Sequence, residues 1–455
     1  MRVLLVRPVR PRHYRVPPLG LLYLAGSLRA AGHEPWLFDP QGARNDGDTF
    51  EQLLRRLDPG VIGVSFHSSE LDGALDLMAR ARRVSPRALR VAGGPHVSAR
   101  PEVIAERHDS FDLGIVGEGE RPLVDVVDSF EQTGAVSAGP GIVSPRLDTH
   151  ASRCASTQRW IPDTLDDLPL PAWDLAPPRA YQGAPQGFVF RRTPTAPILT
   201  SRGCPHRCAF CAGHLVMGRQ LRLRSPKSVL EEADLLVSRY GVRELHIVDD
   251  NFTAHRGRAM EILEGLEARD LTLSFPNGLR ADHLDPEMVR ALRRAGTFAV
   301  SLGIESGSPR VLERMGKSLR LEHVRDAVAR LHEAGVEVGG FFILGFPGET
   351  RADIQRTIDL ALDLPLDRAH FSAFLPLPGT PATALVDAAI PSDSMTYDEV
   401  PWAPKGLTRS ELKGLQRRAF LRFYLRPRPL GSLIRSIRSP AHLRSVLARA
   451  SSYVG

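Results

Sequence analysis

The chain has 455 residues, of which 42% are hydrophobic and 24% are charged. These fractions are typical of globular proteins and exclude a disordered chain or a fibrous repeat, and the length predicts two to four domains. Four cysteines are too few for a disulfide scaffold, which indicates a reducing compartment. We expect a cytoplasmic protein, because we find neither a membrane-spanning run nor a secretory signal.

The net charge of +7 is unevenly distributed along the sequence. After Trp402 there are twelve basic residues and one acidic residue, so the rest of the chain is slightly negative. A negative main body argues against nucleic-acid binding.

Residues 1–130 alternate between short apolar segments and amphipathic segments, which predicts strands joined by helices. We expect strands at 3–6, 35–38, 61–66, 88–92 and 113–116, and helices at 19–31, 50–57, 71–83 and 101–107. This rhythm predicts a doubly wound, flavodoxin-like parallel sheet, in which ligands bind beyond the carboxyl ends of the strands. Residues 131–190 are rich in Pro, Ser, Asp and Thr, which predicts an interdomain linker.

The alternation returns in residues 191–390. We expect six strands at 198–201, 244–248, 273–277, 299–303, 339–344 and 369–375, with helices such as 227–240 and 285–294 between them. Six strands predict a partial (β/α)6 barrel, whose chemistry lies at the carboxyl ends of the strands. Residues 391–455 form the basic tail, which we expect to be helical with a break at 426–429.

Three cysteines follow the first expected barrel strand with the spacing Cys204-x3-Cys208-x2-Cys211. Thiolates suit zinc or iron–sulfur clusters. A structural zinc site needs a fourth ligand, for which His206 and His214 are candidates. Three thiolates on a four-iron cluster leave one iron open to an external ligand, which indicates catalysis. Three free thiols are the remaining alternative.

At these residues the chain resembles the radical S-adenosylmethionine (SAM) enzymes, and Phe210 is the aromatic residue that this family has before the last cysteine. Further motifs follow in order: residues 248–252, which depart from the usual Gly-Gly-Glu form, then Ser301-x3-Glu305 and a Gly-Phe-Pro run at 345–347. The resemblance covers roughly residues 190–385. It implies a [4Fe–4S] cluster on Cys204, Cys208 and Cys211, and SAM contacts from Phe210, Asp249, Asp250, Arg280, Ser301, Glu305, Ser306, Gly345 and Pro347.

Some of these SAM contacts have a simpler alternative. The acidic run at 249–250 also fits a helix cap, and Glu305 and Arg280 also fit ordinary solvated side chains. Cys154 lies outside every motif, and we expect an ordinary linker thiol there.

Residues 1–130 resemble the cobalamin-binding domain that precedes the barrel in a large subgroup of these enzymes. The similar segments are 17–25, 93–97 and 117–120. The Asp-x-His-x-x-Gly signature, whose histidine ligates cobalt, is absent, so either cobalamin binds without a lower protein ligand or the domain no longer binds it. The resemblance implies cobalamin contacts from Leu19, Gly20, Ser65, His67, Ser68, Gly93, Gly94, Pro95, His96, Gly117, Glu118 and Gly119. The two histidines also fit hydrogen-bonding loop residues.

The resemblance implies a cobalamin-dependent C-methyltransferase that acts on an unactivated carbon of a small molecule. One SAM molecule supplies the methyl group through cobalamin, and a second is cleaved to a 5′-deoxyadenosyl radical. Cyclisation, ring contraction and oxidative cyclisation are alternatives, and an iron–sulfur sensor or binding module is a non-enzymatic one. Expected partners are a small-molecule or carrier-bound substrate and an electron donor such as a flavodoxin or ferredoxin. We expect no nucleic acid and no membrane contact.

The basic tail contains one stripe of apolar residues at helical spacing: Leu415, Ala419, Phe420, Phe423 and Tyr424. The surrounding basic residues are Arg417, Arg418, Arg422, Arg426 and Arg428. The stripe predicts a helix packed on the barrel with solvated arginines outside. The alternative is an electrostatic site for an anionic partner, which is a reductase, a carrier protein or an acidic membrane surface.

Overall fold

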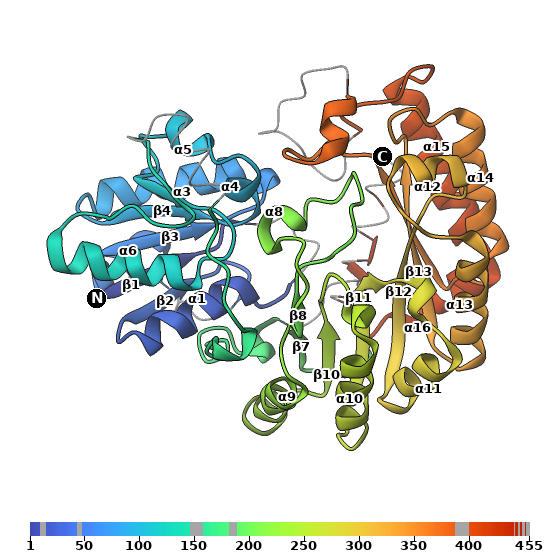
Figure 1. Ribbon diagram of the computed structural model, residues 1–455, viewed down its shortest axis with the longest axis horizontal. Coiled ribbons are helices and arrows are strands. Elements are labelled where there is room, and N and C mark those ends of the chain that lie inside the picture. The colour runs from blue at the N-terminus through green and yellow to red at the C-terminus, as the bar shows by residue number, and fades with distance from the viewer. Residues whose placement is uncertain are drawn as a thin grey trace.

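A computed structural model gives the fold of the chain. It describes residues 1–9, 15–42, 48–145, 158–181, 189–386, 400–440, 442–444, 446–447 and 451. Two six-stranded sheets form the two halves of the molecule, which lie side by side in Figure 1 with the amino-terminal half in blue. Among these residues, no helix is long and apolar enough to cross a membrane.

The strands of the amino-terminal sheet are β1 (Arg2–Val6), β2 (Glu34–Phe38), β3 (Val61–Ser65), β4 (Leu89–Gly93), β5 (Leu113–Ile115) and β6 (Ile142–Val143). Their order is β2-β1-β3-β4-β5-β6, and every pair except β5–β6 is parallel. The helices are α1 (Leu19–Ala30), α2 (Phe50–Leu57), α3 (Leu71–Val84), α4 (Pro95–Ala99), α5 (Val103–Glu106) and α6 (Glu120–Thr133).

Helices cover both faces of this sheet, as the sequence predicts. Val3 and Leu5 of β1 point into one hydrophobic core together with α1 and α6, whereas Leu4 and Val6 point into a second core with α2 and α3. Strands covered on both faces read as continuous apolar runs, which is why β1 shows no polar alternation. The predicted doubly wound fold is confirmed.

The strands of the second sheet are β7 (Thr195–Ile198), β10 (Glu244–Ile247), β11 (Thr272–Leu279), β12 (Thr297–Glu305), β13 (Glu337–Leu344) and β14 (Arg368–Ala373). They are all parallel in the order β14-β13-β12-β11-β10-β7, so this is the predicted open (β/α)6 barrel. The barrel helices are α9 (Pro226–Tyr240), α10 (Arg256–Glu267), α11 (Pro286–Arg294), α12 (Pro309–Arg314), α13 (Leu321–Glu333) and α14 (Arg351–Asp363).

The basic tail provides α15 (Arg409–Tyr424) and α16 (Pro427–Ser436). Helix α15 begins with a capping box at Thr408 and buries Leu415, Ala419 and Phe423 against the barrel, next to the edge strand β14. Covering an edge strand protects its unpaired backbone groups from other chains. The expectation that this stripe packs on the barrel is confirmed. The break lies at residues 425–426, earlier than the predicted 426–429, whose last three residues begin α16.

Two expectations about individual elements were wrong. The expected strand 198–201 is split, because the Thr200 N–H donates to Asp249 Oδ1 at 2.6 Å and not to a neighbouring strand. The chain then leaves the barrel as β8 (Ser201–Arg202), which pairs with antiparallel β9 (Arg222–Leu223). The expected helix 101–107 is shorter, because only α5 (Val103–Glu106) lies within it. A separate helix, α4 (Pro95–Ala99), ends before Pro101, which disfavours helical backbone at the residue before it.

Within the expected linker, α6 ends at Thr133 and β6 joins the amino-terminal sheet, and residues 158–181 pack on both halves. The Tyr181 hydroxyl donates to Asp39 Oδ2 at 2.8 Å in the amino-terminal half. The Trp173 indole N–H donates to Glu232 Oε1 of α9 at 3.0 Å, and both side chains are buried. The linker therefore ties the two sheets together. Cys154 lies outside the described residues.

Candidate active site

The three cysteines lie on the loop between β8 and α8 (His214–Met217). At the start of this loop, Gly203 has a φ of +83°, and a side chain there would approach the Gln220 carbonyl oxygen to 2.2 Å. The middle of the loop is also held by the barrel, because the Ala209 N–H donates to the Met315 carbonyl at 2.8 Å. These contacts fix the loop beside the carboxyl ends of the barrel strands.

The thiols of this loop have the chemistry of ligands. All three are unpaired, and desolvation raises the pKa of Cys208 and raises that of Cys211 to about 11. Such thiols ionise when a bound metal compensates the charge. In the described part of the chain, no three His, Cys, Asp or Glu side chains converge closely enough to hold one metal ion. In a four-iron cluster each thiolate binds a different iron, so its ligands need not converge on one point.

A buried ion pair ends strand β12 beside this loop. Lys317 Nζ donates to Glu305 Oε1 at 3.0 Å, and both side chains are at most 10% exposed. Glu305 has a φ of +67°, a strained conformation for a residue with a side chain, and such strain is concentrated at functional sites. Lys317 and Arg280 also place positive charge near Cys208 and oppose the rise of its pKa.

The two adjacent aspartates after β10 have different environments. Asp249 is buried, and its carboxylate accepts hydrogen bonds from the Thr200 N–H, from Thr200 Oγ1 at 2.5 Å and from Ser201 Oγ at 2.6 Å. Asp250 is exposed, and its negative charge raises the pKa of Cys211. The geometry thus makes Asp249 an organiser of the β7–β8 junction and leaves Asp250 as the candidate ligand for an ammonium group.

The remaining predicted SAM contacts also differ in their burial and in their partners. Arg280 is held by Asp282 through two hydrogen bonds of 3.0 and 2.7 Å, and Ser301 is half-buried on β12. Ser306 is fully buried, and its Oγ contacts Thr357 Oγ1 at 3.1 Å, so it supports the site from behind. Phe210 packs on a small apolar cluster between the cysteine loop and the barrel.

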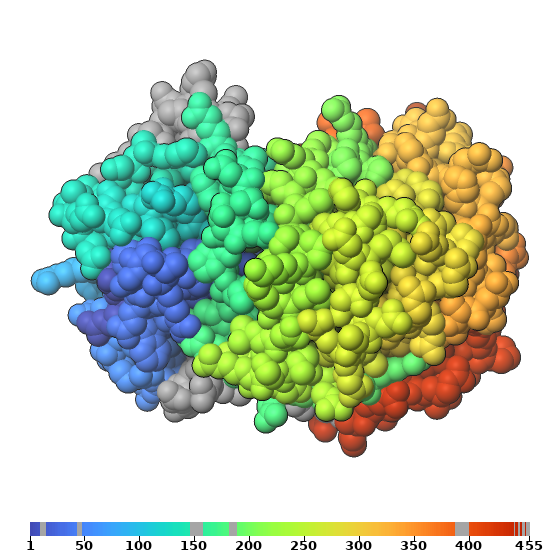
Figure 2. Space-filling view, turned by 60° about the horizontal axis from the view of Figure 1, so that its bottom comes forward, coloured from blue at the N-terminus to red at the C-terminus, as the bar shows by residue number. Residues whose placement is uncertain are grey.

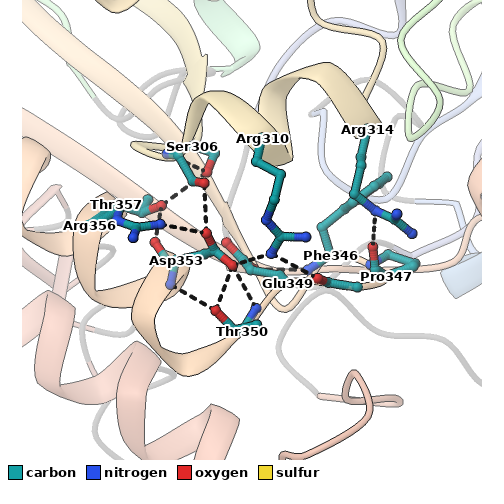
Figure 3. A network of polar contacts seen from close by, with 12 residues as sticks. Ser306, Arg310, Arg314, Phe346, Pro347, Glu349, Thr350, Asp353, Arg356 and Thr357 are labelled. Carbon is teal, nitrogen blue, oxygen red and sulfur yellow. Dashed lines mark hydrogen bonds and ion pairs between the residues drawn. The ribbon is translucent and has the colours of Figure 1, made fainter.

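The loop after β13 contains Gly345 and Pro347, and Figure 3 shows how it is held. Its backbone N–H groups at 345 and 346 donate to Glu349 Oε2, while Arg314 of α12 donates to the Pro347 carbonyl at 3.2 Å. Burial raises the pKa of Glu349 to about 8. Burial therefore favours the neutral form of this carboxyl under the loop.

Asp353, in the first turn of α14, joins this loop to the end of β12 (Figure 3). It accepts hydrogen bonds from Ser308 Oγ at 2.7 Å, Thr350 Oγ1 at 2.6 Å and Arg356 Nη1 at 3.0 Å, and it pairs with Arg310 of α12. Although burial opposes ionisation, these hydrogen bonds lower its pKa below the usual value. Two of the candidate SAM-binding segments are thus fixed by one anion behind them.

The predicted cobalamin contacts gather at the carboxyl edge of the amino-terminal sheet. They lie at the ends of β3 and β4 or in the segments that follow β1, β3, β4 and β5: Leu19, Gly20, Ser65, His67, Ser68, Gly93, Gly94, Pro95, His96, Gly117, Glu118 and Gly119. A Cβ at Gly20 would meet no atom within 4 Å, and one at Gly93 only the Ile115 carbonyl at 3.7 Å. Backbone beside such open space fits the approach of a large flat ligand.

Two of these residues are buried and have partners within the protein. His96 is fully buried on Phe66, with its Nδ1 2.9 Å from Ser68 Oγ, so its ring supports the edge from below. Glu118 is also buried, and its carboxylate pairs with Arg202 of β8 at 2.5 Å and with Arg222 of β9. The local sequence identified residues at the ends of the strands, but it did not show the distant residues with which they pair.

Further contacts place the two edges against each other. Arg159 runs past Gly117, and its guanidinium donates to the carbonyls of His214 and Leu215 at 3.1 and 2.7 Å, in α8. Arg202 also pairs with Glu120 at 2.6 Å. Sequence reasoning missed these residues together with Lys317. The only signal for Lys317 was that lysine is rare in this arginine-rich chain.

Comparisons with known proteins agree with this geometry. The family model for the radical SAM superfamily matches residues 198–361, and the model for the B12 binding domain matches residues 9–127. The first span covers the barrel except β14 and the start of β7, and the second covers the amino-terminal sheet except β1 and β6.

Similar proteins include several methyltransferases. An uncharacterised methyltransferase of Pyrococcus horikoshii is 31% identical over 91% of this chain and 89% of its own length. The cytidylyl-2-hydroxyethylphosphonate methyltransferase of Streptomyces wedmorensis is 29% identical over 80% of this chain and 76% of its own. An anaerobic magnesium-protoporphyrin IX monomethyl ester cyclase of Cereibacter sphaeroides is 29% identical over 90% of this chain and 67% of its own.

The fold is shared with solved structures. The radical SAM methyltransferase TsrM from Kitasatospora setae, solved with cobalamin and a [4Fe–4S] cluster, superposes with a TM-score of 0.67 at 21% identity. The match covers 84% of this chain and 73% of that chain. The cobalamin-dependent radical SAM enzyme OxsB superposes with a TM-score of 0.64 over 79% of this chain and 51% of that chain, also at 21% identity.

Proposed function

Because the chain belongs to the radical SAM enzymes that carry a cobalamin-binding domain, we propose that it methylates an unactivated carbon of a small molecule. The observation that carries the proposal is the contact between the cysteine loop and the glycine-rich sheet edge, which Arg202, Glu118 and Arg159 hold together. Methyl transfer to a radical requires that the radical-forming and methyl-carrying groups face one substrate, and this contact supports such an arrangement.

The residues present fit the cofactors that this family uses. Cys204, Cys208 and Cys211 would hold a [4Fe–4S] cluster, Asp250 and Glu305 would orient SAM, and the edge at Gly93 and Gly117 would receive cobalamin. When bound, the cluster supplies the electron that cleaves SAM to a 5′-deoxyadenosyl radical, and cobalamin supplies the methyl group.

The protein's own contribution is positioning. The strained backbone at Glu305 aims its carboxylate while Lys317 compensates the buried charge. The buried anion Asp353 keeps the ends of β12 and β13 at a fixed separation. Pre-organised groups of this kind cost no reorganisation at the moment of reaction.

Radical cyclisation is the second candidate, because one similar protein that matches 90% of this chain is a cyclase. The stoichiometry of products separates the two reactions. The protein would be reconstituted anaerobically with iron, sulfide and hydroxocobalamin, and then given methyl-deuterated SAM, a flavodoxin-type or chemical reductant, and metabolite extracts.

Methyl transfer predicts equal amounts of S-adenosylhomocysteine, 5′-deoxyadenosine and a deuteromethylated product. Cyclisation predicts 5′-deoxyadenosine without S-adenosylhomocysteine, and this result would overturn the proposal.

A further inference from the structure

Helix α16 has two of its three large aliphatic side chains on its outward side, while the third, Leu433, is half-buried. Its buried residues are Pro429, Ser432 and Ser436, whereas Leu430 and Ile434 on the other side are 42% and 60% exposed. Surface helices of globular proteins normally turn their apolar stripe toward the core. The orientation of α16 is fixed by Arg428, whose Nε donates to Asp367 Oδ1 at 3.2 Å.

The exposed apolar side chains extend beyond this helix. Of the ten large hydrophobic side chains that are exposed in the described part of the chain, five lie within residues 425–447, which we call the tail surface. Leu425 precedes α16 and is 75% exposed, and Leu443 and Leu447 follow it. The segment is anchored by His442, which is fully buried with its ring 4.8 Å from that of Phe190.

The charge of the tail surface has one sign. No acidic residue follows Glu411 in the sequence. Arg435, Arg438 and Arg444 are exposed, and none has an ion-pair partner among the described residues. Apolar side chains surrounded by unpaired arginines complement a surface that is anionic outside and apolar beneath.

We propose that the tail surface docks on an anionic lipid bilayer. Leucine and isoleucine side chains would enter the acyl boundary, and the arginines would pair with headgroup phosphates. An acidic protein would satisfy the arginines but would give no separate reason for outward-facing leucines along such a length of chain.

The position of the tail surface suits this role. Asp367, the partner of Arg428, comes directly before β14, so α16 lies near the amino ends of the barrel strands. The cysteine loop lies beside the opposite ends of these strands. Figure 2 shows the carboxy-terminal residues in red as a ridge along the lower right edge of the molecule. Docking there leaves the candidate active site uncovered.

Vesicle sedimentation with the full-length protein tests the proposal. We expect binding to vesicles of phosphatidylcholine with phosphatidylglycerol, and none to phosphatidylcholine alone. Combined Arg435→Glu, Arg438→Glu and Arg444→Glu should lower the vesicle affinity about 100-fold, and Leu430→Ser with Ile434→Ser should lower it about tenfold. The matched control is Arg55→Glu, Arg83→Glu and Arg87→Glu, three exposed arginines of the amino-terminal domain, which should bind like the unaltered protein.

Three results would overturn the proposal. One is equal binding to both kinds of vesicle, and another is equal loss in the control triple variant. The third is failure to bind anionic vesicles while an acidic flavodoxin-class protein binds at the same arginines, because the tail surface would then be a protein-docking site. Unchanged circular dichroism and unchanged 5′-deoxyadenosine formation show that the variants are folded, and every outcome is independent of the proposed methyl transfer.

Discussion

Arg202 of β8 and Glu118 after β5 form an ion pair with Nη1 and Oε2 2.5 Å apart, and their side chains are 4% and 3% exposed. Arg202 lies just before Cys204, and Glu118 lies between Gly117 and Gly119. One pair therefore joins the loop that we assign to the cluster with the edge that we assign to cobalamin. Although burial opposes it, Glu120 and Glu118 raise the pKa of Arg202, which keeps it charged.

Breaking this pair should uncouple the cleavage of SAM from the transfer of the methyl group. Glu118→Ala leaves Arg202 with Glu120 alone and leaves the buried Arg222 without an ion-pair partner among the described residues, which costs about 3–5 kcal/mol. We expect a lower melting temperature, weaker cobalamin binding in spectroscopic titration, and 5′-deoxyadenosine formation that continues without methylated product.

The control is Arg29→Ala, which breaks the pair with Asp174 at 2.6 Å between side chains that are about half exposed. An exposed pair is worth about 0–1 kcal/mol, so cobalamin binding should not change. Equal effects of Glu118→Ala and Arg29→Ala would contradict the positioning role of the buried pair.

The cysteine ligands can be tested one at a time. Cys204→Ala, Cys208→Ala and Cys211→Ala should each lower the iron and sulfide content after anaerobic reconstitution and abolish 5′-deoxyadenosine formation. Cys154→Ala is the matched control and should keep both. A complete cluster in Cys208→Ala, or loss of the cluster in Cys154→Ala, would show a different ligand set.

The two neighbouring aspartates should respond differently to the same substitution. Asp249→Asn turns an amide N–H₂ toward donors that now bind a carboxylate, so we expect destabilisation of about 1–3 kcal/mol in thermal unfolding. Asp250→Asn removes an exposed charge, so stability should be retained while the KM for SAM rises about tenfold. The opposite pattern would return the ammonium-binding role to Asp249.

The raised pKa of Glu349 predicts how the free energy of unfolding depends on pH. Its pKa of about 8 in the folded chain exceeds that of an unfolded glutamate, so the folded state holds the extra proton between about pH 4.5 and 8. The stabilisation is complete below this window and is lost as the pH rises through 8. The melting temperature of the unaltered protein should therefore fall between about pH 6 and pH 9.

Glu349→Gln should reduce this fall. Glu349 Oε2 accepts both backbone N–H groups, and Oε1 has no hydrogen-bond partner among the described residues, so a neutral amide can take its place. Melting curves of the two proteins that change in parallel with pH would show that Glu349 does not titrate in this range.

The sequence by itself determined the two folds and the cysteine loop. Strand and helix periodicity depends on neighbouring residues, and continuous apolar runs such as Val3–Val6 predict strands that are buried on both faces. The spacing of Cys204, Cys208 and Cys211 is likewise a local property, and it was enough to predict the family.

Only the tertiary structure decided what each polar side chain does. Glu118 and Arg202 are 84 residues apart, and Asp249 meets Thr200 from 49 residues away, so no local pattern shows that these carboxylates are already paired. The same holds for α16: an apolar pattern would place Leu430 and Ile434 in the core, but the structure turns both outward. A hydrogen bond or a buried face between distant segments depends on how the elements pack, and that packing is set by the whole chain.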